Sequence, residues 1–177
     1  MKDAYPMPFK GRVEIDETWV GGKVKGKGKG YKGNKTLVVG AIQSGGKIVL
    51  KVVKCRTKED FYGFVKETVH DDAEAIYTDE FPSNKGIGDR NTRHETVNHS
   101  EFEYVRGDVH TNSIENVWGL FKRSIVGTFH HMSVKHLDAY LDELEWRSNN
   151  RENPYLFRDM VKKLIESEPV EFSKLTV

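Results

Sequence analysis

The sequence predicts an α/β domain in which helices cover a mixed β-sheet. Three β-rich segments follow one another between residues 11 and 54. A helical segment then leads into a further short apolar strand. Short turns join antiparallel neighbours, whereas a strand reached through a helix is typically a parallel neighbour. The expected sheet is therefore mixed, and its apolar faces need helices to cover them.

Length and composition fit one globular domain. The chain has 177 residues, of which 37% are hydrophobic and 31% charged, and this is enough to bury a core. We expect one domain over residues 1–177, with its core at about 11–130 and C-terminal helices at about 132–168. There is no membrane-spanning apolar run and no secretory signal, and Cys55 has no second cysteine to pair with. These features predict a cytoplasmic protein with no membrane contact.

The strands follow from short β-branched or alternating segments. Residues 11–20 alternate between apolar and polar side chains and predict the first strand. Residues 36–42 and 47–54, separated by QSGG, predict a hairpin. Residues 73–79 fit a central strand and residues 94–100 a last short one, with a loop between them.

Four helices are expected from the apolar spacing and the cap residues. Thr57 starts the first, with Asp60 in a capping-box position. The second opens near Asn112, the third follows Ser133, and the fourth has Pro154 as its first residue. This order of elements is that of a ribonuclease-H-like domain, a mixed sheet flanked by helices, with extra C-terminal helices.

Three carboxylates stand on these elements. Asp16 lies within the first strand, Asp79 ends the fourth, and Glu115 opens the second helix. If the fourth strand pairs with the first, Asp16 and Asp79 lie about 4.8 Å apart, one strand spacing. Carboxylates this close repel unless cations neutralise them, and Mg²⁺ prefers oxygen ligands. Two such ions can clamp an in-line phosphoryl displacement.

Each carboxylate also has an ordinary structural explanation. Glu115 would complete a capping box with Asn112 as the N-cap. Asp16 would be an exposed strand residue, and Asp79 would belong to a turn. Neighbouring acids compete for the same roles, namely Glu14, Glu17 and Glu80.

The motifs are more specific than the triad alone. The three acids stand in EIDET, YTDE and NSIE, and 35 residues separate Asp79 from Glu115. With VEIDETWVGGK, TLVVGAI and the long block from Val97 to Arg151, the chain resembles the catalytic domain of ISXO-type bacterial insertion-sequence transposases. Their DDE triad is shared with retroviral integrases. The resemblance covers about residues 12–151.

The resemblance implies that Asp16, Asp79 and Glu115 are catalytic and hold two Mg²⁺ ions, with Mn²⁺ able to substitute. It implies Mg²⁺-dependent phosphodiester hydrolysis at transposon ends and strand transfer into target DNA. It also implies a homo-oligomer on paired ends, in the nucleoid of a bacterium. The family pattern further includes His110 and Asn112 just before Glu115, and four residues at the end of the third expected helix, namely Trp146, Arg147, Asn149 and Arg151.

Complete transposases of this type carry an N-terminal zinc-binding and DNA-recognition region. Residues 1–10, which precede the first expected strand, contain no cysteine. We therefore expect either an excised catalytic domain or a truncated element. Two other functions stay open on the residues: a non-catalytic DNA-binding or transposase-assembly partner or inhibitor, and a stand-alone nuclease for branched or RNA–DNA hybrid substrates.

Several basic and polar residues are candidate DNA contacts. The net charge is only +1, but residues 21–35 contain six lysines and no acid. Such a segment either tracks phosphates as point charges or is a solvated hairpin. Lys122 and Arg123 follow Glu115 on the same helix and either contact DNA or form an exposed basic face. The full candidate set is Lys23, Lys25, Lys27, Lys29, Lys32, Lys35, His110, Asn112, Lys122 and Arg123.

Overall fold

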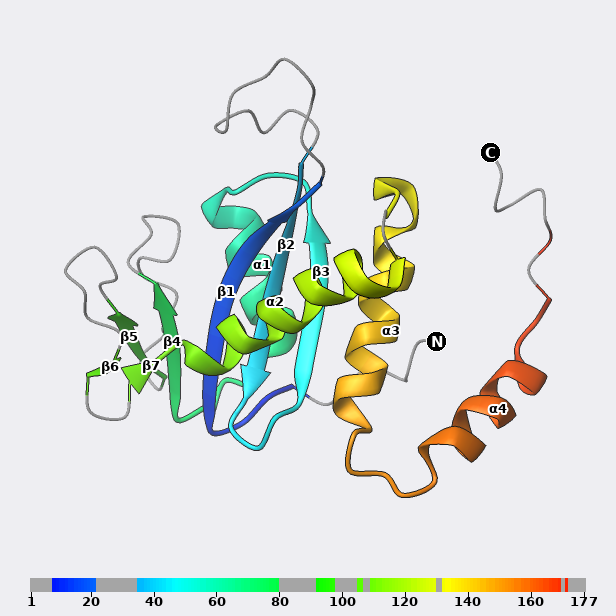
Figure 1. Ribbon diagram of the computed structural model, residues 1–177. Coiled ribbons are helices and arrows are strands. Elements are labelled where there is room, and N and C mark those ends of the chain that lie inside the picture. Colours follow the sequence, from blue (N-terminus) through cyan, green and yellow to red (C-terminus); the bar gives the residue numbers. More distant parts are fainter. Residues whose placement is uncertain are drawn as a thin grey trace, which may run out of the picture.

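A five-stranded mixed sheet forms the centre of the molecule (Figure 1). The computed structural model describes residues 8–21, 35–79, 92–97, 105–106, 109–129, 132–169 and 171. The strands run in the order β3-β2-β1-β4-β5. Strand β1 is antiparallel to β2 and parallel to β4, as the sequence predicts. The strands are β1 (Arg12–Val20), β2 (Thr36–Gln43), β3 (Ile48–Val53), β4 (Ala75–Asp79) and β5 (Arg93–Val97).

Helices α1 (Lys58–Thr68) and α2 (Asn112–Ser124) cover opposite faces of the sheet (Figure 1). They do so because successive residues of a strand point to opposite sides. Val39 shares a buried cluster with Phe64 of α1, whereas its neighbour Val38 shares one with Trp118 of α2. Helix α3 (Leu137–Asn149) joins the second cluster with Leu137, Leu141 and Leu144.

The remaining elements are short or peripheral. The π-helix η3 (Ile125–Phe129) continues α2, and the 3₁₀ turn η4 (Val134–His136) precedes α3. Strands β6 (Val105–Arg106) and β7 (Val109–His110) form a separate small sheet. In the described ranges, no helix combines the length and the apolarity that crossing a bilayer requires.

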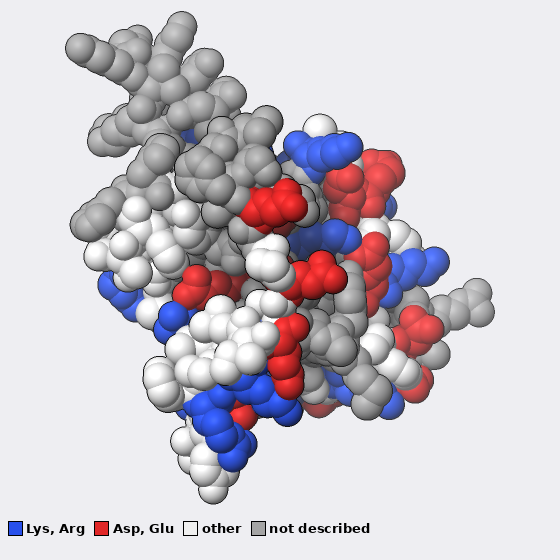
Figure 2. Space-filling model, turned by 90° about the vertical axis from the view of Figure 1, so that its right-hand side faces the viewer, with Lys and Arg blue, Asp and Glu red and all other residues white. Residues whose placement is uncertain are grey.

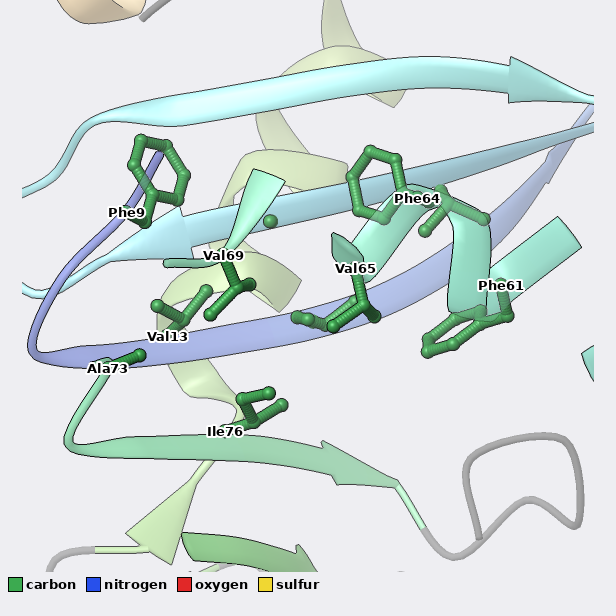
Figure 3. Packing of buried hydrophobic residues seen from close by; sticks show 11 residues of the cluster. Phe9, Val13, Phe61, Phe64, Val65, Val69, Ala73 and Ile76 are labelled. Carbon is green, nitrogen blue, oxygen red and sulfur yellow. The ribbon is translucent and has the colours of Figure 1, made fainter. Parts of the chain in front are cut away.

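The core between α1 and the sheet holds β1 and β4 side by side. Figure 3 shows Val65 of α1 and Val69, which directly follows that helix, lying close to Val13 of β1 and Ile76 of β4. Phe9 closes one end of this cluster, and its N–H donates to the Thr68 carbonyl at 2.7 Å. Each fully buried aliphatic or aromatic side chain contributes about 1.5–3 kcal/mol, so this packing strongly favours the neighbouring positions of β1 and β4.

Two predicted caps are present. Thr57 is the N-cap of α1, where its hydroxyl oxygen accepts a hydrogen bond from the Asp60 N–H at 3.1 Å. Ser133 accepts from the Lys135 N–H at 3.2 Å. However, Ser133 caps the turn η4, and α3 begins only at Leu137.

The expected start of the last helix is wrong by two residues. Helix α4 (Leu156–Glu166) follows Pro154 because Asn153 Oδ1 accepts from the Tyr155 N–H at 2.9 Å and closes a turn there. None of the residues in α4 is buried. Figure 2 faces this side of the molecule and shows uncharged side chains beside basic ones in its lower half. The exposed apolar residues of α4 include Phe157, Leu164 and Ile165.

Helix α3 covers the free edge of β3. The Ile48 N–H donates to Asn149 Oδ1 at 2.7 Å, and Asn149 Nδ2 donates back to the Ile48 carbonyl at 2.9 Å. The Leu50 N–H donates to Glu145 Oε2 at 3.0 Å. Just after α3, Arg151 donates to the turn between β2 and β3. Asn149 and Arg151, two residues of the family pattern, thus satisfy backbone groups that an edge strand would leave unpaired.

We predict that Asn149→Ala lowers the free energy of unfolding by about 1–3 kcal/mol, because it leaves the half-buried Ile48 N–H and carbonyl unpaired. Urea denaturation measures the loss. Asn116→Ala, at an exposed site in α2, is the control and should change stability little. Equal stability of both variants would contradict a role for Asn149 at the edge.

Candidate active site

The parallel pairing of β1 with β4 brings Asp16 and Asp79 together. The ladder matches Glu14 with Tyr77, and the same register two residues further on places Asp16 opposite Asp79. One carboxylate oxygen from each, together with one from Glu17, lie within 4.8 Å of one another. The structure thus brings together two of the three predicted acids and adds Glu17. Their catalytic role stays a prediction.

Glu17 is an unusually buried member of this cluster, with a side chain only 4% exposed. One of its oxygens pairs with Arg56. Among the residues that the structure describes, Glu17 Oε2 finds no hydrogen-bond partner. A buried carboxylate oxygen without a donor is costly, and a cation would relieve that cost. The three oxygen donors therefore fit a hard divalent cation such as Mg²⁺.

Arg56 is the cation that the structure places in this cluster. It stands directly before the cap residue Thr57, at the junction of β3 and α1. Its Nη2 lies 3.9 Å from Asp79 Oδ2 as well as against Glu17. Burial lowers the pKa of Arg56 from its ordinary value, while the charges of Asp79 and Asp16 oppose that shift. At neutral pH the guanidinium stays charged.

Trp118 of α2 binds Asp16 on the face of the sheet that lies opposite α1. Its Nε1–H donates to Asp16 Oδ2 at 3.0 Å, and its ring is buried in the core. Gly40 is paired with Asp16 across the strands and makes room for that ring. A Cβ added at Gly40 would lie 2.7 Å from the Trp118 ring. Helix α2 therefore covers the face of the sheet on which Asp16 lies, and Asp16 is partly buried rather than an exposed strand residue.

Glu14 of β1, rather than Asn112, caps α2. The N-cap residue is Thr111, which makes no side-chain capping bond, so the predicted capping box is wrong. Instead, Glu14 Oε2 accepts from the N–H groups of Ser113 at 2.8 Å and Ile114 at 3.1 Å. A carboxylate suits the positive end of a helix, and Glu14 is accordingly buried.

Glu115 lies in the first turn of α2 but outside the group that converges. It is exposed, and Thr111 Oγ1 lies 3.4 Å from its Oε1. It precedes Trp118 by three residues, so the two occupy neighbouring positions on one side of the helix. Helix α2 thus places Glu115 on the side of the helix that also meets Asp16, without joining it to the two aspartates.

The end of β4 is held by its own contacts. Thr78 is fully buried, and its Oγ1 donates to the Asp79 carbonyl at 2.9 Å and lies 3.0 Å from His94 Nε2. Burial lowers the pKa of His94, so its imidazole is neutral near pH 7. These contacts of Thr78 help to position the end of β4, where Asp79 pairs with Val97.

The predicted DNA contacts are scattered. His110 lies 3.3 Å from Glu14, not beside the two aspartates. Asn112, Lys122 and Arg123 are exposed on α2. Lys35 is half-buried where β2 begins. The other candidates lie outside the described residues, namely Lys23, Lys25, Lys27, Lys29, Lys32 and the rival acid Glu80.

Sequence reasoning missed Arg56 and the polar role of Trp118. The sequence gives only a weak indication for Arg56. It immediately precedes Thr57, the N-cap of α1, so the predicted cap fixes where its backbone lies but not what its side chain contacts. The apolar spacing of the second helix is consistent with the buried position of Trp118, but it does not reveal where the indole N–H points. Glu17 was considered only as a rival to Asp16.

Glycine substitutions test how Trp118 is seated. In Gly40→Ala the added methyl collides with the Trp118 ring, so we expect a loss of about 1–3 kcal/mol and changed tryptophan fluorescence. Gly63→Ala in α1 is the matched control. An added Cβ there meets nothing within 4 Å, and alanine should stabilise the helix by up to about 1 kcal/mol. A tolerated Gly40→Ala would refute the close packing.

Replacing Glu14 with Gln tests the cap on α2. The variant keeps an acceptor but loses the charge at the helix start, so we expect stability to fall by about 1 kcal/mol in urea titrations. Glu74→Gln removes an exposed partner of Arg12 and should have a smaller effect. Equal effects of the two changes would argue against the capping role.

Comparisons with known proteins supply the family. The family model of the ISXO2-like transposase domain matches residues 8–149. An uncharacterized transposase-like protein of Haemophilus influenzae is 33% identical over 88 residues, which span 50% of this chain and 69% of that protein.

Solved structures supply the fold. The catalytic core domain of BIV integrase aligns with a TM-score of 0.53 at 14% identity, over 85% of this chain and 97% of that one. A chain of the simian T-cell lymphotropic virus intasome aligns with a TM-score of 0.50 at 13% identity. The alignment covers 83% of the present chain but only 50% of the intasome chain. The predicted ribonuclease-H-like fold is confirmed. The chain belongs to the ISXO2-like transposase domain family.

Proposed function

We propose that this domain performs Mg²⁺-dependent phosphoryl transfer on DNA, by hydrolysis at transposon ends followed by strand transfer into target DNA. The observation that carries the proposal is the approach of Asp16 and Asp79 across β1 and β4. Two acids from different strands, one held by Trp118 and the other facing Arg56, are poorly explained by strand or turn chemistry alone. Family membership makes transposition the favoured reaction.

Asp16 and Asp79 would hold the metal, with Glu115 reaching it from α2. The donors are all oxygens, and the unpartnered Glu17 oxygen beside them supports the binding of a further cation in this pocket. When bound, a pair of Mg²⁺ ions neutralises the attacking and leaving oxygens of an in-line displacement, and Mn²⁺ is expected to substitute.

The chain's own residues position the reacting groups. Trp118 holds Asp16, and Thr78 fixes the end of β4 before Asp79. In the first step water attacks the phosphodiester and a 3′-hydroxyl leaves. That hydroxyl then attacks a phosphodiester of the target DNA and releases a second 3′-hydroxyl. Positioning and charge neutralisation supply most of the catalysis in such transfers.

DNA would approach along α2. Lys122 lies two turns after Glu115 on the same side of the helix, and Arg123 follows it, both exposed to solvent. The lysines of residues 21–35 would add contacts to the phosphate backbone that carry no sequence information. We further propose that copies of the domain assemble on paired DNA ends, at the bacterial nucleoid.

Asp79→Asn is the direct test. We expect it to reduce Mg²⁺-dependent nicking and strand transfer on oligonucleotide substrates by at least about a hundredfold, because it removes a charged ligand. Circular dichroism should show an intact fold. Asp72→Asn is the matched control, at an exposed carboxylate beside His70, and should keep full activity.

The outcomes separate the competing functions. Equal activity of the Asp79→Asn and Asp72→Asn variants would reject this site. A wild-type chain that binds neither Mg²⁺ nor Mn²⁺, even with DNA present, would favour a non-catalytic assembly partner. Preferential cleavage of branched or hybrid substrates would favour a stand-alone nuclease.

A further inference from the structure

Arg56 reaches the acidic cluster from a third element of the fold. The acids come from β1 and β4, whereas Arg56 comes from the junction of β3 and α1. The capping bond between Thr57 and Asp60 fixes the backbone just after it. Its guanidinium pairs with Glu17 and reaches Asp79 at 3.9 Å. The side chain is only 21% exposed, so solvent screens these charges less than at the surface.

The charges of this group balance in a specific way. Asp16, Glu17 and Asp79 carry three negative charges, and Arg56 carries one positive charge. The net charge of these four described residues is −2, which equals the charge that one divalent cation neutralises. Without Arg56 the three carboxylates would repel one another more strongly before a metal arrives, and they would attract a cation more strongly.

We infer that Arg56 is a positioning residue that acts as the resident counter-ion of this pocket. Glu17 anchors it, and together they hold Asp79 beside Asp16 and set the affinity of the pocket for divalent cations. In this arrangement Glu17 pairs with Arg56 through Oε1 and acts on the ion through its negative charge, not as a direct ligand. The inference rests on the proposed metal site and adds that Arg56 and Glu17 set its affinity for divalent cations.

Calorimetric titration of the chain with Mn²⁺, without DNA, tests the inference. Arg56→Met should tighten Mn²⁺ binding roughly tenfold, because it removes a positive charge several ångströms from the ion. Glu17→Gln should weaken it by a similar factor, because Arg56 then faces only the two aspartates. The double variant restores the wild-type net charge and should bind nearly as the wild type does. Arg56→Lys should also resemble the wild type.

Two controls keep the experiment interpretable. Arg12 begins β1, the strand that carries Asp16 and Glu17, and it pairs with the exposed Glu74. Arg12→Met removes this cation and should leave Mn²⁺ affinity unchanged. Arg56→Met leaves the buried Glu17 unpaired and could fail to fold, which circular dichroism would reveal. In that case Glu17→Gln is compared with the double variant. These two differ only in Arg56, so the difference in their Mn²⁺ affinities measures the effect of the Arg56 charge.

If the loss of Arg56 leaves Mn²⁺ binding unchanged or weaker, in the wild type or in the Glu17→Gln variant, the inference is overturned. Weaker binding in Glu17→Gln with no effect of Arg56→Met would instead make Glu17 a metal ligand, which also overturns it. A wild-type chain that binds no Mn²⁺ would refute the metal site itself. The failure of the proposed function is thus distinguishable from the failure of this inference.

Discussion

Pairing β1 with β4 in parallel requires a crossover between them, and α1 supplies part of it by packing on the same face of both strands. The cluster of Val13, Val65, Val69 and Ile76 holds the two strands in one register. Because side-chain direction alternates along a strand, a slip of one residue would turn Asp79 to the other face of the sheet. The approach of the two aspartates therefore depends on apolar packing at a distance from them.

The opposite face depends on polar contacts instead. Glu14 and Asp16 stand two residues apart on β1, and both accept hydrogen bonds from α2. Burying charged groups is expensive unless donors satisfy them, and here the helix N-terminus and an indole N–H do so. Strand β1 thus packs against α1 with its apolar residues and binds α2 with its acids. The positions of both helices are therefore set by the same strand.

Much of this fold could be predicted from local patterns. Alternation identified β1, the QSGG turn identified the hairpin, and Thr57 with Asp60 identified the start of α1. Asp16 and Asp79 could be paired because topology rules limit which strands are neighbours. The cap of α2 could not be predicted, because it comes from Glu14, 99 residues away from Ser113. Arg56 and Trp118 were missed for the same reason: their partners are distant in sequence.

Helix α2 is fastened to β1 within its first two turns, through the backbone of Ser113 and Ile114 and the indole of Trp118. Beyond Ser124 it continues as the π-helix, in which no residue is buried. The hydrogen bonds to β1 thus lie at the N-terminal end of α2, where Glu115 stands. The C-terminal end is held by apolar packing instead, with Ile125 against the second cluster and Phe129 against Tyr140 of α3. Because Gly127 is exposed and Trp118 is buried, amide protons near Gly127 should exchange with solvent faster than those near Trp118.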